Sequence, residues 1–302
     1  MPLSLEKLWP HDLQVLHELI EQGQALRDDV DLPTRVVQID DGLVVKYGDS
    51  VRLSEALAME LVRTHTSIPV PRVLAYFRDS TESVPDGIGY IVMEQVHGVI
   101  LSEVLDVLND DIIQDITWEF SDYVSELKKL DRLGEWGMVG KDGIYHCGPY
   151  FSYESPHSGT EGPHHSTPLR AKSCTDVLEY FARAVDQSMD EDWAAVTQTT
   201  IDTFDNTKPA SFCHPNLTPE NIMVDPTDGR ITGILDWFGA GWYPYFWMSW
   251  VARNRKDSYS NVQYLKWHRI WTAAMKEYPE SRGFGTLLFE AEAYGVECPG
   301  SR

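Results

Sequence analysis

Residues Phe212 to Asp236 read FCHPNLTPENIMVDPTDGRITGILD, and this stretch decides the fold. Its apolar runs predict three short strands, and the Pro-Thr-Asp-Gly tetrapeptide at 226–229 predicts a turn that joins the last two. The expected strands are Ser211 to Cys213, Asn221 to Val224 and Arg230 to Leu235. Polar residues stand where these strands begin and end, so the stretch has the form of a site built on a frame of short strands.

The polar residues of this stretch follow the spacing of a kinase catalytic centre. In protein-kinase-like sites, a His-x-Asp turn supplies the base, an Asn five residues later binds magnesium, and an Asp that closes the next strand binds the metal bridging the phosphates. Here those three places are held by Asn216, Asn221 and Asp236. The pattern predicts that the metal ligands are retained and that the proton acceptor is not.

Length and composition predict a folded protein without nucleic-acid or membrane partners. A chain of 302 residues that is 42% hydrophobic can bury a sizeable core in one or two domains. Its net charge of −22 would be repelled by a nucleic-acid backbone or an anionic membrane. The four cysteines show no CxxC pairing, which argues against a zinc knuckle or a disulfide framework. The N-terminal residues lack a targeting pattern, and no segment approaches about 18 uninterrupted apolar residues, so we expect a cytoplasmic protein.

The first third of the chain predicts a small antiparallel sheet with one main helix. Leucines at helical spacing indicate a leader helix within residues 11–25. Two β-rich runs around Asp40-Asp41-Gly42 indicate a hairpin, and a helix and two further strands follow. These elements are Arg35 to Ile39, Leu43 to Tyr47, the helix Leu53 to Thr64, Arg72 to Phe77 and Gly89 to Glu94. Strand, strand, helix, strand, strand is the order of a kinase N-lobe.

The remainder of the chain is predicted to be mostly helical. Helices are expected at 101–107, 110–130 and 175–204, and near the end around Trp267, Ile270, Trp271 and Met275. We interpret residues 140–173, with His157, His164 and His165, as a long polar loop and not as a metal site. The predicted fold class is α+β, a two-lobed protein-kinase-like fold with an N-lobe at residues 1–95 and a larger C-lobe at 96–302.

Lys46 and Glu55 form a second candidate constellation. Lys46 lies in the second strand of the hairpin, and Glu55 lies nine residues later at the start of the next helix. Kinases use a buried Lys held by a helical Glu to grip the nucleotide phosphates. A Gly-rich G-x-G-x-x-G loop is missing, since only Gly42 follows two acidic residues, and this weakens an ordinary protein-kinase interpretation.

Four motifs resemble the aminoglycoside phosphotransferase and choline kinase-like family, especially its fungal branch. They are VVKYG, THTSIPVPRVLAYF, YIVMEQVHG and NLTPENIMVDPTDGRITGILDWFGAGWYP, in this order between about residues 35 and 250. The resemblance implies a kinase-like fold that uses ATP and Mg²⁺ to phosphorylate a hydroxyl or amine of a small molecule. It implies that Lys46 holds phosphates, that Glu55 orients Lys46, and that Asn221 and Asp236 bind magnesium. It also implies that Met93, Glu94 and Val96 present backbone groups to adenine.

Two departures from the family pattern concern the acceptor side of the site. The family's catalytic Asp is Asn216 here, and an amide can orient a hydroxyl but cannot accept its proton as a carboxylate does. After Asp236, where acidic residues are common in the family branch, this chain is aromatic. An aromatic pocket suits an apolar or aromatic metabolite and not a polycation. The expected pocket residues are Phe238, Trp242, Tyr245 and Trp247, for each of which packing in the C-lobe core is the alternative.

Three functions remain open on the sequence. The first is an ATP- and magnesium-dependent small-molecule phosphotransferase with a degenerate base at Asn216. The second is a kinase fold repurposed for a non-phosphotransfer reaction, such as a cyclisation or elimination in secondary metabolism. The third is a pseudokinase that binds nucleotide and acts on a protein partner. Lys46, Asn221 and Asp236 favour the first and third, whereas Asn216 and the aromatic residues favour the second and third.

Overall fold

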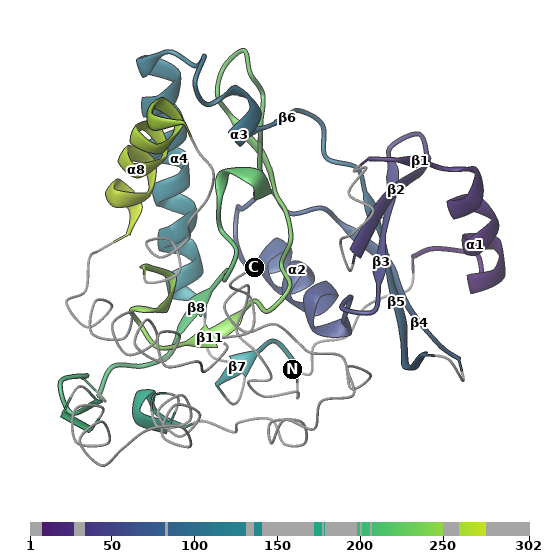
Figure 1. The fold of residues 1–302 in the computed structure, drawn as a ribbon, viewed down its shortest axis with the longest axis horizontal. Helices are drawn as coiled ribbons and strands as arrows, with labels where there is room; N and C mark the ends of the chain where they lie inside the picture. Colours follow the sequence, from purple (N-terminus) through teal and green to yellow (C-terminus); the bar gives the residue numbers. More distant parts are fainter. Residues whose placement is uncertain are drawn as a thin grey trace.

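The structure of the chain is a computed structural model in which two lobes are described. An antiparallel sheet with two helices forms the N-lobe, and a mostly helical part with short strands forms the C-lobe (Figure 1). The described residues are 8–26, 34–81, 84–130, 136–140, 172–176, 178, 198–199, 201–205, 207–249 and 260–275. The predicted α+β kinase-like fold is confirmed.

The N-lobe sheet has the strand order β1-β2-β3-β5-β4, and every neighbouring pair is antiparallel. The strands are β1 (Gln24–Ala25), β2 (Thr34–Asp40), β3 (Leu43–Gly48), β4 (Val73–Thr81) and β5 (Val84–Glu94). The predicted hairpin is present, with Gly42 at φ 75° in the left-handed region that glycine adopts readily. The sequence did not predict β1, because its two exposed residues are too few to show an alternation of apolar and polar side chains.

Helices cover both faces of this sheet. Helix α1 (Leu13–Gln22) begins after Asp12, whose side chain accepts a hydrogen bond from the Val15 amide at 3.1 Å. Its Leu16 packs in one cluster with outward-facing residues of β2, β3 and β5. Helix α2 (Leu53–His65) packs on the opposite face, in the larger cluster that continues into the C-lobe. The sheet is therefore a layer between two helices (Figure 1).

The C-lobe is organised around helix α4. Helix α4 (Asp110–Lys129) packs against α8 (Asn261–Ala274), where the rings of Phe120 and Trp267 meet edge to face at 5.4 Å. Two three-stranded sheets, β10-β9-β6 and β7-β11-β8, lie beside α4. The other elements are β6 (Val99–Ile100), α3 (Leu101–Val104), β7 (Gly137–Met138), β8 (Ser211–Cys213), the 3₁₀ turn Pro219–Asn221, β9 (Ile222–Val224), β10 (Ile231–Ile234) and β11 (Gly241–Tyr243).

Several predicted elements differ from the structure or lie outside its description. Helix α3 is shorter than predicted, and Met275 caps α8 instead of belonging to it. Most of the predicted loop 140–173, with its three histidines, and most of the predicted helix 175–204 lie outside the described residues. The predicted lobe boundary between residues 95 and 96 falls in the connection from β5 to β6.

The segment between α2 and β4 ties the two lobes together. The backbone amide and hydroxyl of Ser67 donate to the two carboxylate oxygens of Glu126 on α4, each at 2.6 Å. The amide of Ile234 on β10 donates to the carbonyl of Pro69 at 2.8 Å. These contacts fix the end of α2 against the frame that carries Asp236. In the part of the chain that is described, no helix is both long enough and apolar enough to cross a bilayer.

We predict that Leu16→Ala lowers the free energy of unfolding by about 2 to 5 kcal/mol, because Leu16 is fully buried between α1 and the sheet. Leu26→Ala is the matched control. That side chain is 42% exposed, so its truncation should change stability by less than about 0.5 kcal/mol. Urea denaturation of both variants measures the difference, and equal effects would contradict the packing of α1 on the sheet.

Candidate active site

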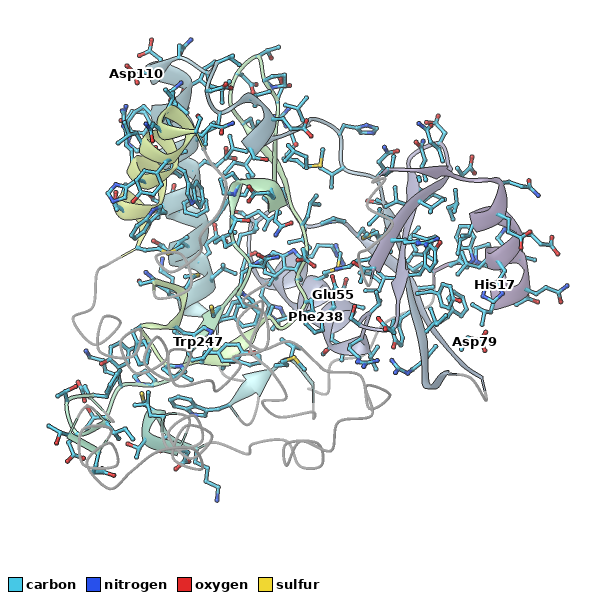
Figure 2. The ribbon with its side chains drawn as sticks, in the orientation of Figure 1. His17, Glu55, Asp79, Asp110, Phe238 and Trp247 are labelled. Atoms are coloured by element: carbon cyan, nitrogen blue, oxygen red, sulfur yellow. The ribbon has the colours of Figure 1, made fainter. Side chains whose placement is uncertain are left out.

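Lys46 is the point at which three distant segments of the chain meet. Its Nζ lies 2.6 Å from Glu55 Oε1 and 2.6 Å from Asp236 Oδ1. Lys46 is 8% exposed and Glu55 is 1% exposed, so the pair is largely removed from water. Figure 2 shows Glu55 in the middle of the molecule, where the sheet meets the C-lobe. Lys46, Glu55 and Asp236, to which the family resemblance gives neighbouring roles, therefore lie together in the structure.

The strand period and the helix start explain why these charges meet. Neighbouring side chains of a strand point to opposite faces, and Val45 belongs to the cluster under α1. Lys46 therefore points to the face that α2 covers. Glu55 lies in the first turn of α2, where the helix dipole favours a carboxylate. Asp236 follows β10, which the Ile234 to Pro69 hydrogen bond holds beside the end of α2.

Mutual attraction outweighs burial at Lys46 and Asp236, whereas burial outweighs it at Glu55. Burial by itself lowers the pKa of Lys46, but the carboxylates of Asp236 and Glu55 outweigh it and hold that pKa above its usual range. Burial likewise opposes ionisation of Asp236, yet the Lys46 ammonium and the hydrogen bonds from Lys46 and Asn216 hold its pKa well below the usual range. Burial raises the pKa of Glu55, whose Oε2 has no hydrogen-bond partner among the described residues. Lys46 is thus the cation on which both carboxylates depend.

Three hydrogen bonds join the 214–221 turn to the segment that carries Asp236. The Asn216 side-chain amide donates to Asp236 Oδ2 at 2.6 Å, and the Leu235 amide donates to the Asn221 carbonyl at 2.8 Å. His214 Nε2 donates to the Leu235 carbonyl at 3.0 Å, while its Nδ1 accepts from the Asn216 amide at 3.1 Å. This pairing fixes the tautomer of His214. His214 therefore supports the turn from inside.

His214 stays neutral in this position. It is fully buried, its ring meets that of Trp237 edge to face at 4.5 Å, and burial lowers its pKa to about 4. A neutral imidazole with both nitrogens in hydrogen bonds is a structural part of the turn and not a proton acceptor for an external group.

Asp236 is held in an unusual backbone conformation. Its φ of 59° is the one positive φ of a non-glycine residue in the described ranges. Such a conformation costs on the order of 1 to 3 kcal/mol and persists where surrounding contacts determine it. The two side-chain donors, Lys46 and Asn216, are contacts of this kind. The backbone of Asp236 therefore carries strain at the place where the carboxylate is presented.

The donor set beside Lys46 fits a hard divalent cation. Asp236 offers carboxylate oxygens, and its side chain is 33% exposed. Asn221 is 5% exposed, and its side-chain nitrogen donates to the Asn216 carbonyl at 2.9 Å, which turns the amide oxygen away from that bond. Carboxylate and amide oxygens suit Mg²⁺, which needs few protein ligands when phosphates supply others. Within the described residues, no group of three or more His, Cys, Asp or Glu side chains lies together as a metal cluster.

The predicted adenine-binding stretch lies at the end of β5. The backbone amides of Glu94 and Gln95 already donate to the carbonyls of Arg72 and Gly42, at 3.0 and 2.8 Å. Val96 is half-buried and leads into the C-lobe. Of the stretch from Met93 to Val96, Val96 is therefore the better candidate to offer an amide to a base, and the role of the stretch stays a prediction.

The Gly42 turn does not occupy the place of a phosphate loop. Leu43 pairs with Glu94, and Gln95 donates to the Gly42 carbonyl, so this turn lies beside the end of β5. Its Asp40 and Asp41 are exposed. This position agrees with the absence of a Gly-rich motif at Gly42, and the preceding connection of the sheet is the one between β1 and β2. Residues 27–33 of that connection lie outside the described residues.

The four predicted pocket aromatics fall into two groups. Trp242 and Trp247 are 3% and 0% exposed and pack in the C-lobe core. These two residues are therefore core residues, which was the alternative to lining a pocket. Phe238 and Tyr245 are partly exposed. In the view of Figure 2, Phe238 lies near the junction of the two lobes and Trp247 lies within the C-lobe. Only Phe238 and Tyr245 remain as candidate acceptor-binding residues.

One positioning element escaped the sequence analysis. Glu126 fixes the segment after α2 through Ser67, and this contact spans 59 residues of sequence. A single Glu on the polar side of a helix gives no signal that it binds a loop of the other lobe. Only the fold reveals that α4 helps to place α2 and Glu55.

A family model described as the phosphotransferase enzyme family matches residues 24–247. The chain belongs to this family. The matched range contains every residue of the Lys46, Glu55, Asn216, Asn221 and Asp236 constellation. No curated protein sequence matches the chain.

Solved structures of aminoglycoside phosphotransferases share the fold of this family member. A ternary complex of a thermostable mutant of APH(4)-Ia with ADP and hygromycin B has a TM-score of 0.52 and 14% identity, covering 95% of both chains. The GDP and kanamycin complex of APH(2")-IIIa has a TM-score of 0.56 and 12% identity, covering 94% of this chain and 90% of that one. The type VIII aminoglycoside-3'-phosphotransferase has a TM-score of 0.51 and 16% identity, covering 92% of this chain and 98% of that one. At these identities the likeness shows the fold alone.

We predict that Lys46→Met lowers the free energy of unfolding by about 3 to 5 kcal/mol, because it leaves buried Glu55 without its cation. Adding Glu55→Gln to that variant should recover part of the loss. Arg63→Ala is the control, since it breaks the more exposed pair with Glu60 and should change stability by less than about 1 kcal/mol. Chemical denaturation of the four proteins tests this, and a Lys46→Met loss no larger than that of Arg63→Ala would contradict it.

Proposed function

We propose that this chain is a small-molecule phosphotransferase that uses ATP and Mg²⁺. The observation that carries the proposal is the buried Lys46, which touches both Glu55 and Asp236 at 2.6 Å. A lysine held in this way presents a fixed positive charge beside a metal-binding carboxylate, which is what phosphoryl transfer requires. The ADP and GDP named for the related structures support a nucleotide in the same fold.

The roles of the individual residues follow from their positions. Lys46 would hold the nucleotide phosphates, and Glu55 would keep Lys46 in place. Asp236 and Asn221 would hold Mg²⁺, which supplies charge neutralisation at the transferring phosphoryl group. Val96, with Met93 and Glu94 beside it, would contact the base. We place the proposed reaction in the cytoplasm.

Asn216 determines what the acceptor side can do. Its side chain can orient a hydroxyl or amine but cannot take up the proton as a carboxylate does. General-base assistance is worth roughly 10² to 10⁴ in rate. Transfer relying on positioning and electrostatics alone would therefore be slow.

The acceptor that fits best is a non-polycationic, apolar or aromatic metabolite. Phe238 and Tyr245 are the partly exposed aromatic residues beyond Asp236. The Lys208 ammonium lies 4.1 Å from the centre of the Tyr245 ring, so a positive charge already occupies one face of that ring. A polycation would be repelled at this place, whereas an uncharged ring would not.

A second candidate is a nucleotide-binding pseudokinase with a protein partner. It is favoured by the 2.6 Å hydrogen bond from Asn216 to Asp236, which directs the amide at the metal-binding carboxylate instead of at an acceptor. The repurposed, non-phosphotransfer enzyme shares this observation but has no need of a nucleotide. Nucleotide binding and phosphate transfer therefore separate the three functions.

We predict that Mg-ATP at millimolar concentration raises the melting temperature by about 5 °C, because binding to the folded state stabilises it by mass action. Asp236→Asn should remove most of this shift, since it removes the metal-binding charge. Asp228→Asn is the control, because Asp228 is exposed on the β9–β10 turn. Differential scanning fluorimetry measures all three proteins. The absence of any shift in the wild type would favour the repurposed enzyme.

We predict that Asn216→Asp increases phosphate transfer about 10²-fold when base catalysis is the missing element. The rates are compared at saturating Mg-ATP with radiolabelled γ-phosphate and a panel of small hydroxylated and amino compounds. Asn216→Ala provides the reference, because it adds no carboxylate and should not gain activity. A variant that binds Mg-ATP and still transfers no phosphate would support the pseudokinase instead.

A further inference from the structure

The Asp236 carboxylate is held by one protein donor on each oxygen. Lys46 Nζ contacts Oδ1 and the Asn216 amide contacts Oδ2, both at 2.6 Å. The backbone of Asp236 has a φ of 59°, so its position depends on such contacts. The carboxylate is therefore already fixed by the protein's own side chains.

Asn216 is itself firmly placed. Its backbone amide donates to His214 Nδ1 at 3.1 Å, and its carbonyl accepts from the Thr218 amide at 3.0 Å and from the Asn221 side chain at 2.9 Å. His214 and Thr218 are 0% and 2% exposed. The amide that reaches Asp236 thus projects from a rigid turn, and the hydrogen bond needs little ordering.

The chemical identity of residue 216 decides whether Asp236 can be held in this way. The Asn side chain is neutral and carries N–H donors, whereas an ionised Asp side chain is negatively charged and can only accept hydrogen bonds. An Asp in the same place would set two like charges at hydrogen-bond distance, which only a cation or a proton between them would relieve. Asn216 therefore does for Asp236 what a bound cation would do if residue 216 were Asp.

Resting on the function proposed above, we propose that Asn216 is a positioning residue that holds the Asp236 side chain without a divalent cation. The nucleotide site is then assembled before any metal arrives. Mg²⁺ alone adds little to a carboxylate whose two oxygens are already paired, and it binds this chain together with the nucleotide phosphates.

Thermal unfolding of the full-length chain without nucleotide tests this proposal. Wild type, Asn216→Ala and Asn216→Asp are compared in EDTA and in 10 mM MgCl₂, roughly the range in which weak carboxylate sites bind Mg²⁺. Asn and Asp are nearly isosteric, so the Asp variant isolates the change of charge. The Ala variant removes the donor and adds no charge.

Adding Mg²⁺ should raise the melting temperature least for wild type, more for Asn216→Ala and most for Asn216→Asp. Wild type should gain less than about 1 °C, and Asn216→Asp should lose several degrees in EDTA and recover most of them with Mg²⁺. A wild-type gain as large as that of the Asp variant would overturn the proposal, as would an Asp variant equally stable in EDTA. If Asn216→Asp does not fold in EDTA or in MgCl₂, the proposal is overturned when Mg²⁺ raises the melting temperatures of Asn216→Ala and wild type equally.

The double variant Asn216→Asp/Asp236→Asn shows whether the effect belongs to this pair. It restores one amide and one carboxylate, so its Mg²⁺ response should fall well below that of Asn216→Asp. A double variant that responds as strongly as Asn216→Asp would place the new metal site elsewhere and contradict the proposal. None of these measurements uses nucleotide, so a failed Mg-ATP shift refutes the proposed function without deciding the role of Asn216.

Discussion

The buried ammonium of Lys46 is the interaction on which the arrangement of the two lobes depends. It joins strand β3 and helix α2 of the N-lobe to Asp236 of the C-lobe. Removing one partner of a buried pair costs far more than the pair contributes when intact, so all three residues must be present together. The contacts of Ser67 with Glu126 and of Ile234 with Pro69 place α2 so that this meeting is possible.

The sequence predicted these parts of the site because each follows from a local pattern. The period of β3 sends Lys46 to the α2 face, and the start of α2 places Glu55 there. The spacing from Asn216 to Asp236 is set by one strand pair, β9 and β10, whose turn residues are strong signals. Where one element or one hairpin determines the geometry, the amino-acid pattern was sufficient.

The remaining parts depend on contacts that no local pattern encodes. Strands β6, β7 and β11 have two or three residues, too few to show a period, and they exist because partner strands lie beside them. Trp242 and Trp247 look the same in sequence as Phe238 and Tyr245, and only the packing of the C-lobe separates buried from partly exposed rings. The short strand β1 was not predicted either, because its place in the sheet depends on pairing with β2.

The two kinds of residue in this site are under different physical constraints. Lys46, Glu55 and Asp236 support both the fold and the proposed chemistry, so an exchange at any of them disturbs a buried charge network. Phe238 and Tyr245 are partly exposed, and residues in such positions can change with less effect on stability. A change of acceptor would therefore cost the fold least at these two partly exposed positions. The buried charge network around Lys46 can thus stay intact while the side chains on the proposed acceptor side vary.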